Sequence, residues 1–322
     1  MSIGKARAYT NIALIKYWGK RDEQLILPMN SSLSLTLDAY YTETSVHFDP
    51  NLKNDLFFLN GQQQAASNNK INLFLNYFRQ EYGGGYAKIE STNFVPTAAG
   101  LASSASGFAA LAGACAAALD LNLSDTELSR LARHGSGSAC RSIFGGFSEW
   151  QKGTSDQDSH AVPILSNGFE NELAMLFVLV DSRVKDISSR DGMKRTVQTS
   201  SFYDGWLSTI DQDILDIKKA IFEKDFQKLG EITEANSLRM HGTTLAASPP
   251  FTYWVPESLN VMQIVRQLRD EGIPCYTTMD AGPNVKILVK KNDLAAVKAA
   301  LLNDFSETQL ITAHAGPGIA LL

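Results

Sequence analysis

The chain has 322 residues, of which 44% are hydrophobic and 20% are charged, and its formal net charge is -5. This length allows two domains of ordinary size, the composition is that of a soluble globular protein, and the negative charge argues against nucleic-acid binding. The longest strand-like apolar run, at 173–180, is far shorter than the ~20 residues that cross a bilayer. The cysteines are scattered without metal-ligand spacing, which favours a reducing, cytoplasmic compartment: Cys115, Cys140 and Cys275.

Strands dominate the first third of the chain. We expect them at 6–19, 31–48, 55–61 and 86–94, where β-branched and aromatic residues gather and where "SLSLTLD" alternates with a period of two. Helices follow. The Ala-rich run 108–119 predicts a buried helix, and a second helix begins after Ser124, which has capping-box spacing to Glu127. This second helix ends near His134, so we interpret that histidine as structural.

Beyond an apolar strand at 173–180 the pattern changes to long helices, at 206–223, 226–239 and 257–271. Two strands, "CYTTM" and "VKILV", flank a tight "DAGPN" turn and precede a last helix at 294–305. This mixture indicates an α+β fold. We expect an N-terminal domain over 1–180 and a C-terminal domain over 181–322.

A basic segment opens the chain, because five basic residues precede the first acid, Asp22: Lys5, Arg7, Lys16, Lys20 and Arg21. Such a run is more often a solvated face than a site. Here apolar residues are interleaved with the bases, so part of the segment should be buried. A buried lysine needs an anionic partner.

The stretch "PTAAGLASSASG" at 96–107 is almost free of large side chains and leads into the Ala-rich helix. A small-residue loop at a helix start is an anion site, because free N–H groups and the helix dipole converge there. Helix capping by Ser103 or Ser104 explains the segment equally well. The local sequence leaves both interpretations open.

Two further clusters carry candidate chemistry. "GSGSACR" at 135–141 offers backbone N–H groups and hydroxyls, and Ser138 and Arg141 are one helical turn apart; alone, it would be read as a flexible turn. Asp280 lies between a strand and Ala-Gly-Pro, which usually makes it a turn former. The same geometry lifts a carboxylate from a rigid strand end, so Asp280 is the best general-base candidate.

Other chemistries lack their signatures. The sequence has no His-Glu-x-x-His, no paired-cysteine metal pattern and no Gly-x-Ser-x-Gly elbow, and its five histidines do not cluster. Of the kinds of chemistry considered, the binding or transfer of phosphate groups is the one that remains.

Five segments resemble those of the diphosphomevalonate decarboxylase family, within the superfamily of galactose, homoserine, mevalonate and phosphomevalonate kinases (GHMP kinases). They occur in the family's order between about residues 4 and 290: "TNIALIKYWGKRDE", "LPMNSSLSLTL", "FVPTAAGLASSASG", "GSGSACRSIFGGFSEW" and "MDAGPNVKIL". The resemblance implies a ribosomal-protein-S5-like N-terminal domain and a ferredoxin-like C-terminal domain, with the site in the cleft between them.

The resemblance also implies roles for particular residues. Catalytic roles fall to Asp280, Arg141 and Asn11. The substrate diphosphate and carboxylate would be bound by Tyr17, Trp18, Gly19, Lys20, Ser136, Gly137, Ser138, Ala139, Cys140, Arg141, Ser189 and Arg190. ATP would be bound by Gly100, Leu101, Ala102, Ser103, Ser104 and Ser106, with Lys70 and Lys185 as weaker suggestions; Mg²⁺ has no assigned ligands but would lie near Ser104 or Ser106.

The implied reaction converts (R)-5-diphosphomevalonate and ATP into isopentenyl diphosphate, ADP, phosphate and CO2. Two alternatives stay open at this point. One is a kinase of the same fold that phosphorylates the 3-hydroxyl without decarboxylation, and the other is a non-catalytic anion-binding module. A homodimer, with no nucleic-acid or membrane partner, is the family expectation.

Overall fold

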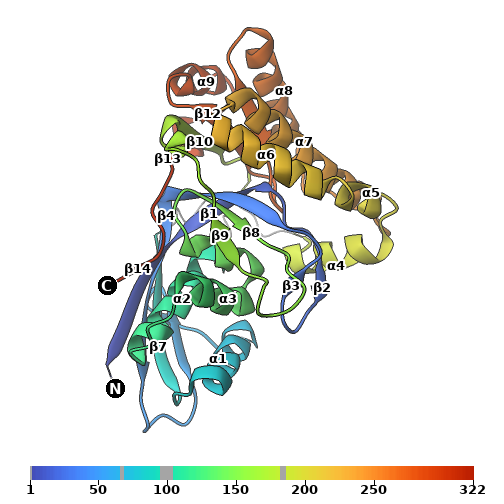
Figure 1. Cartoon of the computed structure of the whole chain (residues 1–322). Coiled ribbons are helices and arrows are strands. Elements are labelled where there is room, and N and C mark those ends of the chain that lie inside the picture. Colours follow the sequence, from blue (N-terminus) through green and yellow to red (C-terminus); the bar gives the residue numbers. More distant parts are fainter. Residues whose placement is uncertain (1, 66–68, 95–103, 182–185) are drawn as a thin grey trace.

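The computed structural model describes residues 2–65, 69–94, 104–181 and 186–322. They form two antiparallel-rich β-sheets with helices in layers around and between them (Figure 1).

The first sheet is built on two long neighbouring strands, β1 (Ile3–Ile15) and β4 (Ser32–Phe48), which pair antiparallel. Their alternating pattern buries one residue in two over much of their length. The path continues from β4 through β7 (Ala87–Phe94), β5 (Leu56–Leu59) and β6 (Gln62–Gln63). The remaining short strands are β8 (Phe147–Trp150), which pairs with β4; β9 (Ala161–Pro163), which pairs with β8; β14 (Ala320–Leu321), beside β1; and the separate pair β2 (Lys20–Asp22) and β3 (Leu27–Pro28).

Three helices cover one face of this sheet: α1 (Asn69–Tyr82), α2 (Ser104–Ala118) and α3 (Asp125–Gly135). The Ala-rich helix is confirmed as α2, and it is buried on nearly all sides, as its uniform apolarity predicts. Helix α3 has the expected capping box between Ser124 and Glu127. His134 lies in its last turn, as predicted.

The second sheet has the order β11-β12-β10-β13, all antiparallel. Its strands are β10 (Leu173–Val178), β11 (Cys275–Thr278), β12 (Val285–Lys290) and β13 (Leu310–His314). The expected pairing of the strands around the "DAGPN" turn is confirmed.

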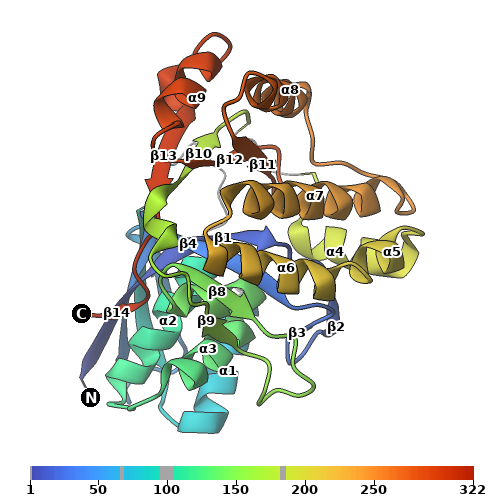
Figure 2. The ribbon, with the colours of Figure 1, turned by 45° about the horizontal axis from the view of Figure 1, so that its top comes forward.

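Helices α8 (Pro256–Asp270) and α9 (Leu294–Leu301) pack on the outer face of the second sheet. Helices α6 (Ile210–Glu223) and α7 (Phe226–Leu245) lie between the two sheets (Figure 2). The helix expected over 206–223 is divided, because α5 (Tyr203–Leu207) ends before α6 begins. The remaining elements of the described residues are α4 (Ser189–Thr199) and the 3-10 helices η2 (Gly137–Ile143), η3 (Phe169–Glu172) and η4 (Glu307–Gln309).

Apolar side chains form three cores, one beneath α1–α3, one beneath α8 and α9, and one between the sheets. The third core joins the two halves, since it contains Leu14 of β1, Leu35 of β4, Phe177 of β10 and Ile217 of α6. Strand β10 precedes residue 180 yet pairs in the second sheet, and β14 returns to the first. The domain division at residue 180 stays a prediction. None of the helices in the described ranges is long and apolar enough to cross a membrane.

Candidate active site

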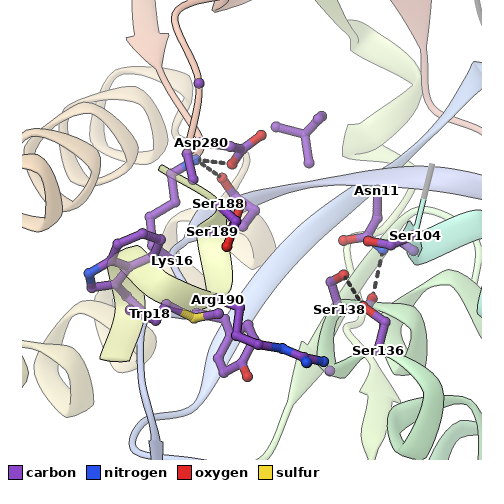
Figure 3. A pocket seen from close by; sticks show the side chains of 18 of the residues that line it. Asn11, Lys16, Trp18, Ser104, Ser136, Ser138, Ser188, Ser189, Arg190 and Asp280 are labelled. Carbon is purple, nitrogen blue, oxygen red and sulfur yellow. Dashed lines mark hydrogen bonds and ion pairs between the residues drawn. The ribbon is translucent and has the colours of Figure 1, made fainter. Parts of the chain in front are cut away.

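A cavity of about 650 Å³ opens between the two halves of the molecule. Its wall is built by the end of β1, the start of α2, the turn from α3 into η2, the start of α4 and the segment that joins β11 to β12. In Figure 3, Asn11, Ser104, Ser136 and Ser138 gather on one side of the pocket. Asp280 and Lys16 lie on the other.

The cavity is basic, although the whole chain is acidic. Its described wall carries six basic and two acidic side chains: Lys16, Lys20, Lys70, Arg141, Arg190 and Lys286 against Asp181 and Asp280. A cleft lined by one sign of charge concentrates ligands of the opposite sign. This site is therefore suited to anions.

Ser136, which joins α3 to η2, forms a tight turn with Gly137 and Ser138, the first residues of η2. The turn is ordered 3-10 structure with a mostly buried backbone, so the reading as a flexible surface turn is wrong. A Cβ on Gly137 would lie 2.6 Å from the Trp150 ring, so only glycine fits there. The hydroxyls of Ser136 and Ser138 both reach the cavity.

Arg141 is fixed by a buried hydrogen-bond network. Its Nε donates to Ser34 Oγ at 3.0 Å and to Asn11 Oδ1 at 3.2 Å, and its Nη1 donates to the Ser32 hydroxyl. Asn11 in turn donates to Ser138 O at 3.0 Å and to Ser142 Oγ at 2.8 Å. Asn11 therefore holds the guanidinium and the serine turn together.

Asp280 is held by one lysine on each carboxylate oxygen. Lys16 Nζ lies 2.8 Å from Oδ1 and Lys286 Nζ lies 3.0 Å from Oδ2. Both lysine side chains are buried, at 3% and 5% exposure, whereas that of Asp280 is 40% exposed and faces the cavity. Burial alone would raise the pKa of Asp280, but the two ammonium groups hold it well below its usual range. Burial lowers the pKa of Lys16 to about 8, against the opposing effect of Asp280.

Pairing of Lys16 with Asp280 confirms the expectation that a buried lysine of the basic N-terminal segment has an anionic partner. Next to it, Tyr17 packs edge-on against Trp150, and Trp18 Nε1 donates to Thr196 Oγ1 at 2.9 Å. Gly19 has a φ of +114°, and a Cβ there would lie 2.2 Å from the Tyr203 hydroxyl.

Lys70, Lys20 and Arg190 form a cationic group at the cavity wall. Burial lowers the pKa of Lys70, and the nearby charges of Arg190 and Lys20 lower it further. Cations that disfavour one another's charge are stabilised by an anion between them. A phosphate group meets that requirement.

The structure brings most of the expected site residues to this cavity, but not all. Gly19, Ser106, Ala139 and Cys140 are not in its wall. Ser106 is fully buried, and its hydroxyl lies 2.9 Å from that of Thr42. Ser104 and Ser106 are two residues apart on a helix, so they point to different sides. Five expected ATP contacts lie outside the described residues: Gly100, Leu101, Ala102, Ser103 and Lys185.

Sequence reasoning missed Lys286 and did not assign Lys16 to the site. A signal for Lys286 existed, since it is the one charged residue in "VKILV", and a buried strand tolerates a lysine only with a partner. The sequence could not indicate which carboxylate would be that partner.

Comparison with known proteins identifies the family. Residues 8–161 match the model of the diphosphomevalonate decarboxylase-like N-terminal domain, and residues 175–317 match that of the mevalonate 5-diphosphate decarboxylase C-terminal domain. The chain is 37% identical to the diphosphomevalonate decarboxylase of Candida albicans over 315 residues, which cover 92% of this chain and 87% of the relative.

Solved structures agree. Mevalonate diphosphate decarboxylase from Staphylococcus aureus is 55% identical, with a TM-score of 0.97 over 99% of this chain and 98% of that one. A second solved chain, in complex with MVAPP, AMPPCP and magnesium, is 64% identical, with a TM-score of 0.96 over 99% and 98% of the two chains. The two-sheet α+β architecture is thus the GHMP kinase fold, and the chain belongs to the diphosphomevalonate decarboxylase family.

Proposed function

We propose that this cavity is where the chain, an ATP-dependent decarboxylase, converts (R)-5-diphosphomevalonate and ATP into isopentenyl diphosphate, ADP, phosphate and CO2. The observation that carries the assignment is the Asp280 carboxylate, which opens into a basic cavity between two lysines. The reaction needs such a group because a tertiary hydroxyl must be oriented and phosphorylated before it can leave.

The serine turn and the cationic group would hold the phosphate groups. Ser136 and Ser138 offer hydroxyl donors, and Lys20 and Arg190 offer charge for the substrate diphosphate. Lys70 lies close enough to Lys20 and Arg190 for their charges to lower its pKa. It would bind a phosphate group of the nucleotide, beside the substrate diphosphate.

Asp280 would accept a hydrogen bond from the C3 hydroxyl and take its proton as the phosphoryl group moves. Its pKa, well below the usual range, makes it a weak base in the ground state. Proton transfer must therefore accompany phosphoryl transfer, when the hydroxyl becomes acidic. The same negative charge then stabilises the cationic character that develops at C3 as phosphate departs.

Arg141 would orient the C1 carboxylate without clamping it. Its Nε is committed to Ser34 and Asn11 and its Nη1 donates to Ser32, so the contact with the carboxylate would fall mainly to Nη2. A weaker contact suits the chemistry, because a carboxylate bound too tightly in the ground state resists loss as CO2. The electron pair of the C1–C2 bond, which breaks as CO2 leaves, becomes the new double bond between C2 and C3.

ATP is the co-substrate and Mg²⁺ accompanies it. The described residues contain no cluster of three or more His, Cys, Asp or Glu side chains that could hold a metal alone. Mg²⁺ in nucleotide sites is held largely by phosphate oxygens and water, with one or two protein oxygens, so the hydroxyl of Ser104 at the cavity wall fits this need. The ion supplies charge neutralisation at the phosphates.

Product analysis tests the assignment. Incubation with ATP, Mg²⁺ and diphosphomevalonate should give ADP, inorganic phosphate and CO2 in equal amounts, with isopentenyl diphosphate as the organic product. Elimination follows at once because the phosphorylated species is already oriented, which makes the step intramolecular. A stable 3-phospho product with ADP but no CO2 would indicate the kinase of the same fold. ATP turnover absent with every mevalonate derivative would indicate an anion-binding module.

The chain would act as a cytoplasmic homodimer. Its three cysteines are free and buried, which is compatible with a reducing compartment. On α6, Leu215 and Phe222 are exposed and seven residues apart, so they share a face that a second copy could cover. Sedimentation analysis of the purified chain measures the oligomeric state.

A further inference from the structure

Lys286 is a buried cation on a largely apolar strand. It lies on β12 among Val285, Ile287 and Leu288, which are all buried, and its side chain is 5% exposed. Its ammonium has the carboxylate of Asp280 as its ion-pair partner and, among the described residues, pairs with no other carboxylate. Replacing a buried ion pair by apolar side chains is often neutral or stabilising, so stability alone does not account for this lysine.

The two lysines beside Asp280 are not equivalent. Lys16 also donates to Ala13 O at 2.8 Å, so it serves the backbone at the end of β1 as well. Lys286 is committed to Asp280 Oδ2. A carboxylate turns easily about its last torsion, and one contact per oxygen fixes its plane. Without Lys286 one oxygen would lose its restraint.

The charges around Asp280 show what Lys286 adds. Lys16 approaches from the end of β1, Lys286 from β12 and Arg141 from η2, while His241 of α7 is kept neutral because burial lowers its pKa to about 3. Anionic substrates raise the affinity of a nearby carboxylate for protons. A second lysine beside Asp280 offsets this rise in proton affinity when the anionic substrates occupy the cavity.

We propose that Lys286 is a positioning residue for the reaction: its ion pair with Oδ2 keeps Asp280 ionised and oriented while the anionic substrates occupy the cavity. This inference rests on the proposed function. It assigns Lys286 no contact with substrate; its effect passes through Asp280.

Three variants test it by kinetics over pH 5 to 9. In Lys286→Met, kcat should fall about 10- to 100-fold at neutral pH, with KM for both substrates changed less than about threefold, and this loss should grow toward pH 5, because an Asp280 with one lysine less is more readily protonated once the anionic substrates are bound. Lys286→Arg should restore most of the rate at every pH, because a guanidinium stays charged. Lys290→Met is the matched control: it lies on the same strand and face, over the Phe226 ring, and should behave as the native chain.

A double-variant cycle asks whether the effect passes through Asp280. Asp280→Asn should lose at least ~10² in kcat, and adding Lys286→Met should cost less than about threefold more. Equal losses in both backgrounds would overturn the proposal. So would a loss in Lys286→Met that is the same at every pH, a loss in Lys286→Arg that grows toward pH 5, or the same loss in Lys290→Met.

Binding calorimetry separates this inference from the proposed function. Diphosphomevalonate should bind to Lys286→Met with a dissociation constant within about threefold of that of the native chain, since Lys286 has no contact with substrate. A much weaker affinity would overturn the positioning role without involving turnover. A native chain that produces no CO2 would instead overturn the proposed function. If Lys286→Met does not fold, Lys286→Gln, which also lacks the charge, takes its place in both measurements.

Discussion

At the scale of single residues, the side chains of the site hold one another in fixed orientations through hydrogen bonds. Arg141 is 2% exposed and is held on two nitrogens by serines of β4 and by Asn11. The side-chain amide of Asn11 is hydrogen-bonded within the same network, so Asn11 acts on the substrate by holding Arg141 and Ser138 in place. Such groups are costly to bury unless each polar atom is satisfied, and that requirement fixes their orientation.

Arg141→Lys tests the role of the planar guanidinium. Lysine cannot reach Ser32, Ser34 and Asn11 at once, so we expect kcat/KM for diphosphomevalonate to fall at least ~10-fold while the KM for ATP changes little. Steady-state kinetics with each substrate varied in turn measure both. A raised KM for ATP with unchanged substrate kinetics would move Arg141 to the nucleotide.

At the scale of elements, helix α2 separates two serines that the sequence presents together. Ser104 reaches the cavity from the first turn of the helix, whereas Ser106 turns toward Thr42 on β4. The helical period of 3.6 residues makes this divergence unavoidable. The two residues therefore form a matched pair for experiment.

Ser104→Ala should raise the KM for ATP or lower kcat while the melting temperature stays nearly native. Ser106→Ala should leave the ATP kinetics nearly native and lower the melting temperature. It removes a buried hydroxyl that is hydrogen-bonded to Thr42, which should cost about 1 kcal/mol, or a few degrees in melting temperature. Thermal melts and ATP kinetics of both variants give the comparison. A melting loss in Ser104→Ala with intact ATP kinetics would mean that Ser104 only caps the helix.

At the scale of the whole molecule, buried histidines couple stability to pH. Burial and the charge of Arg133 lower the pKa of His134 to about 4, and burial and Lys16 lower that of His241 to about 3. In the unfolded chain both would titrate near ~6.5. The unfolded state therefore binds more protons below that pH, and acid favours it.

We expect the free energy of unfolding to be at its full value above pH ~6.5 and to fall as the pH drops toward 4, by up to about 1.4 kcal/mol per pH unit for each histidine. Denaturant unfolding at pH 7.5, 6 and 5 measures the slope. His134→Gln should lower the slope of the unfolding free energy against pH by the contribution of one histidine. A slope that is the same with and without His134 would show that its protonation does not differ between the two states.

The sequence by itself determined the local structure and the chemistry of the family. A run of strand-forming residues predicted β1, period-two alternation predicted β4, uniform apolarity predicted α2, and Ser124 with Glu127 marked the start of α3. These features depend on neighbours a few residues away. The resemblance in five segments identified the reaction class, which the family matches bear out.

Tertiary structure alone decided which of these residues meet. Asp280 pairs with Lys16 across 264 positions of the sequence, β14 returns to β1 at the end of the chain, and the guanidinium of Arg141 is met by serines from β4. No local pattern encodes such contacts, because they follow from how the two sheets and the helices between them pack. The pairing of Lys286 with Asp280 is closer in sequence, because the turn between β11 and β12 brings the two residues together; what the tertiary structure adds is Lys16 on the other oxygen of the same carboxylate.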